Sequence, residues 1–298
     1  MRWIIAICAM WIVSFSGVFQ VHAQPLVQIE WLQENLKNDN IVVLDIRSPR
    51  KSRDFYAEGH IEGAVSAPYN EGWRDTVNGV IGMLPPVEKI SAHIGRLGVS
   101  NDSHVVIVPF GNSSTDFSAA TRIYWTFKVL GHDRVSILEG GYSAWLAAGQ
   151  RLSKTAVVPS QTKFEAKLQP HLIATEEDVH EAIKGGVSLV DARPKAQFEG
   201  KAKSPVVAKA GTIPQAMNLR QSTLYNPKSN QFLSEEGVNQ SIAGIGIDTE
   251  NHSIAFCNTG HWASIAWFAL SEIAGKKNIS LYDGSMAEWT AKEANPVQ

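Results

Sequence analysis

Short apolar stretches alternate with helical stretches along most of the chain, and the same order of elements occurs twice. In the first half, segments 41–45 and 105–108 are rich in Val and Ile and predict two buried strands. Segments 187–191 and 253–256 repeat this pattern in the second half. Apolar strands that alternate with helical segments are typical of parallel sheets buried under helices. The pattern therefore predicts an α/β fold of two tandem domains, each a parallel sheet flanked by helices on both faces.

Further segments of the two halves correspond to each other. Residues 59–64 have a counterpart in residues 211–216, with Gly, Ile and Ala at matching places. Helical stretches are predicted for 117–130 and 263–274, each following the second strand of its half. Crossover connections between parallel strands are right-handed, which places helices on both faces of each sheet.

The repeat also defines the domain boundaries. We expect a first domain at 24–150, a linker at 151–170 and a second domain at 171–298. The linker is polar, contains Pro159 and has no clear periodicity. Residues 175–178, Thr-Glu-Glu-Asp, resemble a capping box that begins the first helix of the second domain.

The beginning of the chain has the pattern of a signal peptide at 1–23. Arg2 gives it a positive start, residues 3–18 are almost wholly apolar, and residues 21–23, Val-His-Ala, fit a cleavage site. This predicts a periplasmic or secreted protein with no membrane association after cleavage. An uncleaved anchor is the competing interpretation, for which the apolar stretch is a little short.

Cleavage would leave Cys257 as the single thiol of the mature chain, because Cys8 lies within the predicted signal peptide. A lone thiol cannot form an intramolecular disulfide. It is either an inert buried thiol or a nucleophile. Cys257 directly follows the strand 253–256 and precedes an apolar helix. It is therefore expected at the carboxyl end of a sheet strand, where ligands gather in α/β proteins.

The short loop after Cys257 is suited to binding an anion. It contains Gly260, which tolerates backbone angles that other residues avoid. Main-chain N–H groups turned toward the sulfur, with the positive end of the following helix, would favour a thiolate or a persulfide. We expect this cradle to consist of Asn258, Thr259, Gly260, His261 and Trp262.

The first half has no nucleophile at the corresponding place. Its second strand is followed by residues 109–114, Pro-Phe-Gly-Asn-Ser-Ser. We therefore expect the first domain to be structural or to form one wall of the cleft.

Several motifs resemble the tandem-domain rhodanese family, the thiosulfate and 3-mercaptopyruvate sulfurtransferases of the exported bacterial type. These motifs are Asp-x-Arg at 45–47 and 191–193, the segments 56–64 and 119–145, and Tyr-Asp-Gly-Ser-Met-Ala-Glu-Trp at 282–289. The likeness covers nearly all of the mature chain, in the same order and in both halves.

The resemblance implies a double-displacement sulfurtransferase. Cys257 would take sulfane sulfur as a persulfide from a small anionic donor, thiosulfate or a mercapto acid, and pass it to cyanide, a thiol or a protein acceptor. Residues 258–262 would form the cradle, and Arg193 is a candidate for binding the donor, because a guanidinium suits a sulfonate or carboxylate. Many thiosulfate-using relatives have basic side chains in this loop, whereas here only His261 can become cationic. The donor therefore stays open.

Two other functions compete with this interpretation. Dual-specificity phosphatases of the cell-cycle type share the fold, but their loop requires an arginine where this chain has Ala263, and no arginine follows Cys257. The phosphatase hypothesis is therefore rejected. A periplasmic persulfide carrier or redox partner protein without small-molecule turnover stays open.

Composition limits the partners of the protein. The 298 residues carry a net charge of −2 and are 44% hydrophobic, without a basic run of the kind that binds nucleic acid. The sequence shows no recognisable metal-ligand spacing and no phosphate-binding loop. We expect neither a metal nor a cofactor, and no nucleic-acid partner.

Overall fold

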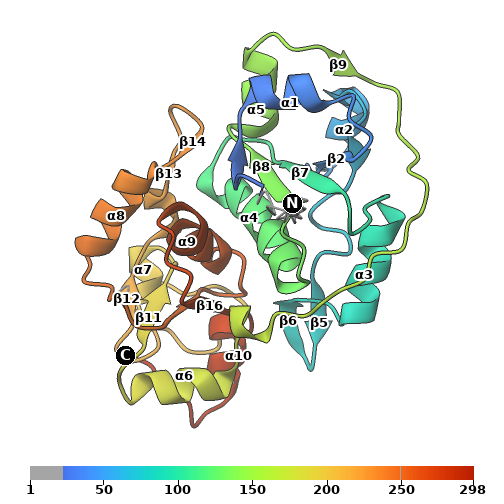
Figure 1. The fold of residues 1–298 in the computed structure, drawn as a ribbon. Coiled ribbons are helices and arrows are strands. Elements are labelled where there is room, and N and C mark those ends of the chain that lie inside the picture. The colour runs from blue at the N-terminus through green and yellow to red at the C-terminus, as the bar shows by residue number, and fades with distance from the viewer. Residues whose placement is uncertain (1–22, 249) are drawn as a thin grey trace, which may run out of the picture.

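The computed structural model describes residues 23–248 and 250–298 of the chain. These residues form two α/β domains, coloured blue to green and yellow to red in Figure 1, each built on a five-stranded parallel sheet. The strand order is β1-β8-β7-β2-β4 in the first domain and β10-β16-β15-β11-β12 in the second. The two orders correspond strand for strand, which confirms the predicted tandem fold.

The first domain contains the predicted strands and helix in the expected order. Its elements are β1 (Leu26–Val27), α1 (Ile29–Asn35), β2 (Ile41–Asp45), α2 (Phe55–Glu58), β3 (His60–Ile61), β4 (Val65–Ser66), β5 (Asp75–Val77), β6 (Val80–Met83), α3 (Val87–Arg96), β7 (His104–Val108), α4 (Ser114–Val129), β8 (Val135–Leu138), α5 (Gly141–Ala147) and β9 (Leu152–Ser153).

The second domain begins with a short 3-10 helix, and the predicted capping box of Thr175 and Asp178 is present at the start of its first α-helix. The helix predicted for 263–274 consists of an α-helical part, α9, and a π-helical continuation, η3. The elements are η1 (Pro170–Leu172), β10 (Ile173–Ala174), α6 (Glu176–Ile183), β11 (Ser188–Asp191), α7 (Lys195–Phe198), β12 (Met217–Asn218), η2 (Gln221–Thr223), β13 (Tyr225–Asn226), β14 (Gln231–Phe232), α8 (Glu235–Ala243), β15 (Ser253–Phe256), α9 (Ala263–Phe268), η3 (Ala269–Ile273), β16 (Ile279–Tyr282) and α10 (Ser285–Ala291).

Alternate residues along each central strand face opposite layers of helices. In the second domain, Ile254 and Phe256 belong to a core with α6 and α10, whereas Ala255 belongs to a core with α8 and α9. The first domain is built in the same way, with α1 and α5 on one face and α3 and α4 on the other. Because successive side chains of a strand point to opposite faces, each sheet is buried on both sides.

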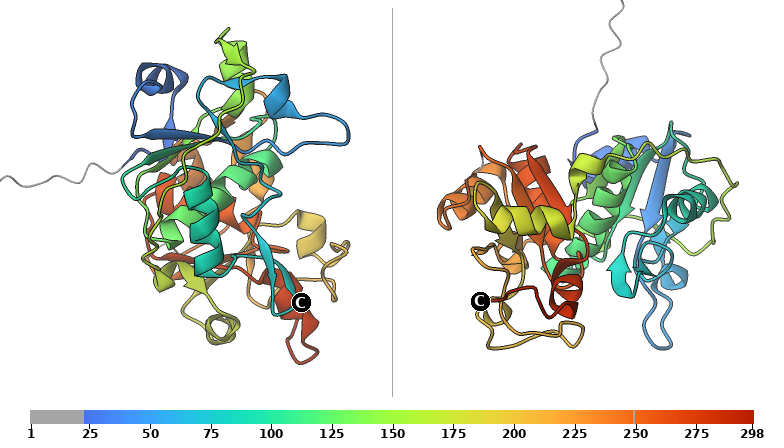
Figure 2. Two further views of the ribbon diagram at one scale, coloured as in Figure 1. Left: turned by 90° about the vertical axis from the view of Figure 1, so that its right-hand side faces the viewer. Right: turned by 90° about the horizontal axis from the view of Figure 1, so that it is seen from below.

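The two domains are joined by one continuous hydrophobic core. Helix α4 packs against α9 between the two sheets, and Figure 2 shows the domains as two lobes joined along this layer. Nearly all of α4 is buried, because it covers its own sheet with one side and the other domain with the opposite side. The Thr121 and Ser264 hydroxyls are hydrogen-bonded across the interface at 2.8 Å.

The segment predicted as a linker lies along the first domain. Strand β9 pairs antiparallel with β3, the Thr162 amide donates to the Gly95 carbonyl, and Phe164 is buried. The segment therefore adds to the first domain's core before the chain enters the second domain.

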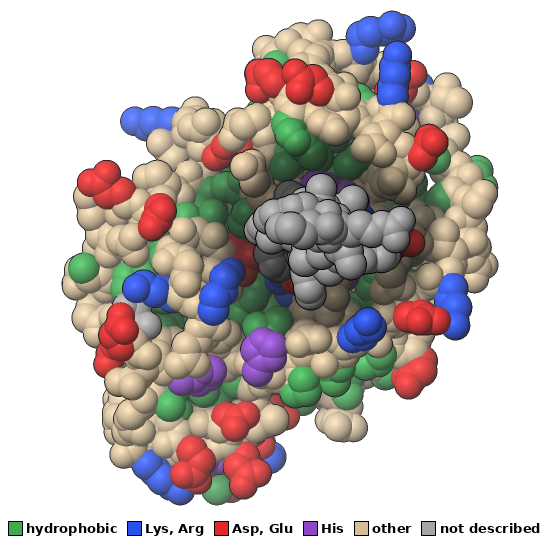
Figure 3. All heavy atoms as spheres, viewed as in Figure 1, with side chains coloured by type: hydrophobic (Ala, Val, Ile, Leu, Met, Phe, Trp, Pro, Cys, Tyr) green, Lys and Arg blue, Asp and Glu red, His purple; other side chains and the backbone are tan. Residues whose placement is uncertain are grey.

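Residues 1–22, all but the last residue of the predicted signal peptide, lie outside the described residues. Among the described helices, none combines the length and the apolar character that a bilayer span requires. Lys and Arg side chains are interspersed with Asp and Glu over the face shown in Figure 3.

Candidate active site

Cys257 lies directly after β15, the central strand of the second sheet. Strand alternation places it on the same face as Ala255, toward the first domain. The residue is only 1% exposed. The thiol is therefore enclosed at the interface between the domains, at the end of the strand that the sequence predicts.

The hydroxyl of Ser285, at the beginning of α10, holds the loop that follows Cys257. Its oxygen accepts hydrogen bonds from the amides of Cys257 and Gly260, both at 3.1 Å, and the hydroxyl donates to the Tyr282 carbonyl at 2.8 Å. Gly260 and Ser285 have φ values of 74° and 51°, in the left-handed region that favours glycine. The loop is thereby closed into a compact turn.

The other amides of this loop are left available. Within residues 23–248 and 250–298, the main-chain N–H groups of Asn258, Thr259, His261 and Trp262 have no hydrogen-bond acceptor. Most main-chain donors in folded proteins are paired. Successive unpaired amides in a tight loop form a concavity that binds anions. The loop therefore offers main-chain donors to a negatively charged group next to Cys257.

Asn258 connects the loop to its own domain. Its Nδ2 donates to Oε1 of Gln197, on α7, at 2.9 Å. Its Oδ1 is buried and has no partner in the described part of the protein. One end of the amide thus holds the loop against α7, and the other end is free to accept a hydrogen bond from a ligand.

Residues of the first domain cover the remaining part of the loop. Arg74 Nη2 donates to the Thr259 carbonyl at 2.5 Å. Trp262 Nε1 donates to Thr115 Oγ1 at 3.3 Å, and its ring packs against the common core. The first domain therefore forms one wall of the site, as expected from its lack of a nucleophile.

His261 is fixed between two groups of the first domain. Tyr69 Oη lies 2.8 Å from Nδ1, and the Thr115 carbonyl lies 3.0 Å from Nε2. Since a carbonyl only accepts, Nε2 carries the proton and Nδ1 accepts from Tyr69. Burial, with Arg74 and Arg122 nearby, lowers the pKa of His261 to about 3. The imidazole is therefore neutral at physiological pH.

A buried ion pair joins the domains next to the loop. Arg122 Nη1, on α4, contacts Asp283 Oδ1 at 2.5 Å, and both side chains are almost fully buried. The other Asp283 oxygen accepts the Leu84 amide at 2.6 Å. A Cβ at Gly260 would overlap Arg122 Nη1, so the missing side chain at Gly260 makes room for the pair. Because each charge has a partner, the pair adds no net charge to the site.

Arg193 lies inside the second domain. Its guanidinium binds both Asp191 carboxylate oxygens, and its Nη2 donates to the Gly211 carbonyl at 2.8 Å. The first domain repeats the arrangement with Arg47 and Asp45. The arrangement is that of a structural ion pair at the strand end, and donor binding by Arg193 stays a prediction.

The first domain contains a loop with the same main-chain framework. Amides of α5 donate to the carbonyls of residues 109 and 110, and amides of α10 donate to those of residues 257 and 258. Gly141, at the start of α5, has a φ of 57°, close to the 51° of Ser285. The two loops are therefore structural equivalents.

The first-domain loop differs in what its amides bind. The Asp116 carboxylate accepts from the Phe110 amide at 3.2 Å and from the Gly111 amide at 2.6 Å. A carboxylate of the protein thus occupies donors of this loop. In the second domain, the corresponding region contains Cys257 and unoccupied amides.

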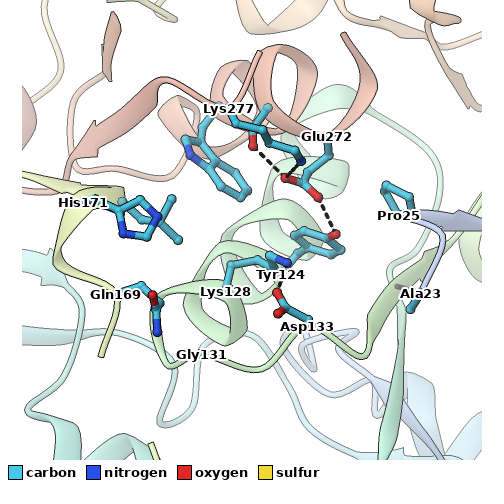
Figure 4. A pocket seen from close by; sticks show the side chains of 13 residues that line it. Ala23, Pro25, Tyr124, Lys128, Gly131, Asp133, Gln169, His171, Glu272 and Lys277 are labelled. Atoms are coloured by element: carbon cyan, nitrogen blue, oxygen red, sulfur yellow. Dashed lines mark hydrogen bonds and ion pairs between the residues drawn. The ribbon is translucent and has the colours of Figure 1, made fainter. Parts of the chain in front are cut away.

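Two cavities at the domain interface differ in their relation to Cys257. A pocket of about 270 Å³ is lined by the first-domain loop and by Tyr69 and His261, which cover the Cys257 loop. A cavity of about 650 Å³ lies at the other end of α4, where Glu272 binds Tyr124 and Lys277 (Figure 4). His261 is the residue of the Cys257 loop that lines the smaller pocket, and no residue of this loop lines the larger cavity.

The described residues contain no group of three His, Cys, Asp or Glu side chains that could hold a metal ion.

A model of the rhodanese-like domain matches residues 28–148 and again 175–292. The chain belongs to the rhodanese family.

Similar proteins share both rhodanese domains. A putative thiosulfate sulfurtransferase of Mycolicibacterium smegmatis is 31% identical over 279 residues, which cover 92% of this chain and 97% of that protein. The thiosulfate sulfurtransferase of Cricetulus griseus is 32% identical over 290 residues, covering 91% of this chain and 94% of its own. The structure of SseA from Escherichia coli, described as a 3-mercaptopyruvate sulfotransferase, is 26% identical with a TM-score of 0.76, covering 88% of this chain and 99% of that one.

Sequence reasoning did not single out several residues that shape this rhodanese site. Tyr69 and Arg74 come from a connecting segment without a periodic pattern, so no sequence signal placed them at the loop of the other domain. Arg122, Asp283 and Ser285 lie within the motifs that carry the family resemblance. Ser285 had one possible signal: it stands where the first half has Gly141, and a change from glycine at a tight turn indicates a side chain with a role.

Proposed function

We propose that this rhodanese is a sulfurtransferase that moves sulfane sulfur from thiosulfate or a mercapto acid to a thiophilic acceptor through a persulfide on Cys257. The observation that carries the proposal is the set of main-chain donors, in the loop that begins at Cys257, for which the described part of the protein supplies no acceptor. Charge-assisted hydrogen bonds from such amides stabilise a thiolate and a persulfide anion. The thiosulfate and 3-mercaptopyruvate relatives support the same assignment.

The reaction proceeds in two displacements. The Cys257 thiolate attacks the outer sulfur of the donor, so that a new S–S bond forms and the bond from the outer sulfur to the rest of the donor breaks. With thiosulfate, sulfite leaves with the bonding electron pair. The acceptor, cyanide or a thiolate, then attacks the outer sulfur of the persulfide, and the Cys257 thiolate leaves. Covalent catalysis thus divides one transfer into two easier steps.

The enclosure of Cys257 favours small donors and acceptors. With 1% of the residue exposed and first-domain side chains over the loop, a protein partner would have to displace Tyr69 or Arg74 to reach the sulfur. The pocket of about 270 Å³ that His261 and Tyr69 line is of a size for a small molecule. A carrier that serves a protein partner is therefore the weaker alternative.

Intact-protein mass spectrometry tests the proposal. After incubation with thiosulfate or mercaptopyruvate, the protein gains about 32 Da, one sulfur atom, and loses it on addition of cyanide. Cys257→Ser removes both the gain and the steady-state transfer. Transfer that persists in this variant contradicts the proposal, and loading without turnover identifies the carrier instead. The two donors, compared at equal concentration, also identify the preferred one.

We further propose that the enzyme is exported and that residues 1–23 are removed. The apolar stretch and the Val-His-Ala site support this. The protein recovered from a periplasmic or secreted fraction is expected to begin at Gln24. A start at Met1 in a membrane fraction would support the anchored alternative.

A further inference from the structure

The Cys257 loop contains no lysine or arginine, although the donors proposed for this enzyme are anions. The arginines near it differ in whether their charge is already balanced. Arg122 is paired with Asp283, and Arg193 is paired with Asp191. Neither pair brings net positive charge to the loop.

Arg74 is the exception among the cations that contact the loop. It lies just before β5, and its Nε and Nη2 donate to the carbonyls of Gly82 and Thr259 at 2.9 and 2.5 Å. In the part of the chain that the structure describes, no carboxylate forms an ion pair with it. Carbonyl partners orient the guanidinium without neutralising it, so its full charge acts on the loop.

The hairpin of β5 and β6 is shaped to hold this guanidinium. Gly82 has a φ of 80°, and a Cβ there would overlap Arg74 Nη2. Any other residue at position 82 would therefore displace the guanidinium from Thr259. The absence of a side chain at Gly82 fixes Arg74 over the other domain's loop.

The other polar groups over the loop cannot replace this charge. Tyr69 is hydrogen-bonded to His261, and His261 is neutral because burial and the two arginines lower its pKa to about 3. The Tyr69 phenol also lies within electrostatic range of both Arg74 and Cys257. Arg74 is thus placed beside the groups that cover the thiol.

We propose that Arg74 of the first domain binds the anionic group of the sulfur donor above Cys257 and so provides the positive charge that the Cys257 loop lacks. The proposal rests on the sulfurtransferase function given above. Arg74 donates to the Gly82 and Thr259 carbonyls and also to the Tyr69 hydroxyl, and its remaining N–H groups would bind the sulfonate or carboxylate. The active site is therefore assembled from both domains, with the nucleophile in one and the donor-binding cation in the other.

The charge of Arg74 can be tested without sulfur transfer, through alkylation of Cys257. Iodoacetate is an anion and iodoacetamide is neutral, yet both react with the same thiolate. Arg74→Gln is expected to lower the ratio of the iodoacetate rate to the iodoacetamide rate about tenfold, because only the anion loses an attractive charge. Arg74→Lys should keep most of the ratio. Arg96→Gln, which removes an exposed charge of α3 in the same domain, should leave it unchanged.

A purely structural role of Arg74 predicts equal changes in both rates, and an unchanged ratio in Arg74→Gln overturns the proposal. Melting temperatures of all variants show whether each is folded. In Arg74→Gln, but not in Arg96→Gln, the thiosulfate KM is expected to rise about tenfold with little change in kcat, as for lost uniform binding. If the wild type gains no sulfur while the alkylation ratio still depends on Arg74, the sulfurtransferase proposal fails and the anion site stands.

Discussion

The two domains have loops with the same main-chain framework in the same place, but the amides of these loops differ in their protein partners. In the first domain, the Asp116 carboxylate accepts hydrogen bonds from two amides of the loop that follows β7. In the second domain, four amides of the loop that follows β15 have no acceptor among the described residues, and Cys257 lies at the start of this loop. The comparison shows that the same framework presents amides to a carboxylate in the first domain, where Asp116 accepts them, and that no protein carboxylate accepts the described amides of the second loop.

A second difference concerns the residue that begins the helix behind each loop. Gly141 adopts a left-handed conformation that glycine tolerates without strain. Ser285 adopts nearly the same conformation with a side chain, and its hydroxyl accepts the amides of Cys257 and Gly260. Pro109, the counterpart of Cys257, has no main-chain N–H and so cannot donate a hydrogen bond to a hydroxyl at this place. The serine therefore has a role only in the domain that carries the nucleophile.

The strongest test of this comparison moves the nucleophile. Pro109→Cys, introduced together with Cys257→Ser, is expected to gain no sulfur from thiosulfate, because Asp116 already occupies amides of that loop. Adding Asp116→Ser should free these amides and permit some loading. Intact-protein mass measures both. Full loading of the thiol introduced in the first domain, with Asp116 in place, would show that the free amides are not required.

The equivalent arginines of the two domains should matter for stability to a similar degree. Arg47→Ala and Arg193→Ala each leave a buried carboxylate unpaired, and we expect each to lower the free energy of unfolding by about 3–5 kcal/mol. Urea denaturation measures the loss. A donor-binding Arg193 would instead give a raised donor KM in a protein of nearly unchanged stability, with no counterpart effect at Arg47.

Removal of the serine hydroxyl should affect the second loop alone. In Ser285→Ala, the amides of Cys257 and Gly260 lose their hydrogen-bond acceptor. The loop conformation that binds the sulfur should lose about 1–2 kcal/mol of stabilisation. The rate of sulfur loading should therefore fall roughly tenfold. Ser285→Gly removes the same hydroxyl while relieving the left-handed strain, and should load as slowly. Ser143→Ala, which removes a hydroxyl from the equivalent helix α5 of the first domain, is the matched control. Equal loading rates in the wild type and in both Ser285 variants would remove Ser285 from the site.

The smallest expected effect concerns His261, which has no histidine counterpart in the first loop. Its folded pKa of about 3 lies below the value of about 6.5 in an unfolded chain. Below pH 6.5 the unfolded chain therefore binds more protons, and stability falls as the pH falls from 6.5 toward 3. At pH 5.5, this histidine should account for about 1 kcal/mol of the loss. His261→Gln should show a smaller loss between pH 7.5 and 5.5 than the wild type, and an equal loss would assign the effect to other groups.

Much of the fold could be predicted from the sequence, because it depends on local patterns that occur twice. The strands predicted at 41–45 and 105–108, the position of Cys257 and the capping box at Thr175 all follow from periodicity and residue type, and β7 begins one residue earlier than predicted. The candidate site was harder to predict from the sequence, because several of its residues come from the first domain. Tyr69 and Arg74 reach the loop only through the packing of α4 against α9, which no local pattern describes.

Arg193 shows what motif reasoning within one domain leaves open, because donor binding by this residue stays a prediction. A guanidinium two residues after a strand is suited to an anion, but the Asp191 carboxylate lies close by and accepts from its Nε and Nη2. The sequence already favoured a structural role, because Asp45 and Arg47 repeat the same spacing in the half without a nucleophile. A motif shared by an active and an inactive domain points to folding more than to chemistry.

The most direct test of the cradle is a crystal structure of the protein loaded with sulfur from thiosulfate. The outer sulfur of the Cys257 persulfide is expected to lie within hydrogen-bonding distance of the free amides between Asn258 and Trp262, with Ser285 unmoved. An outer sulfur that points away from these amides into the apolar core, with no main-chain donor directed at it, would contradict the account.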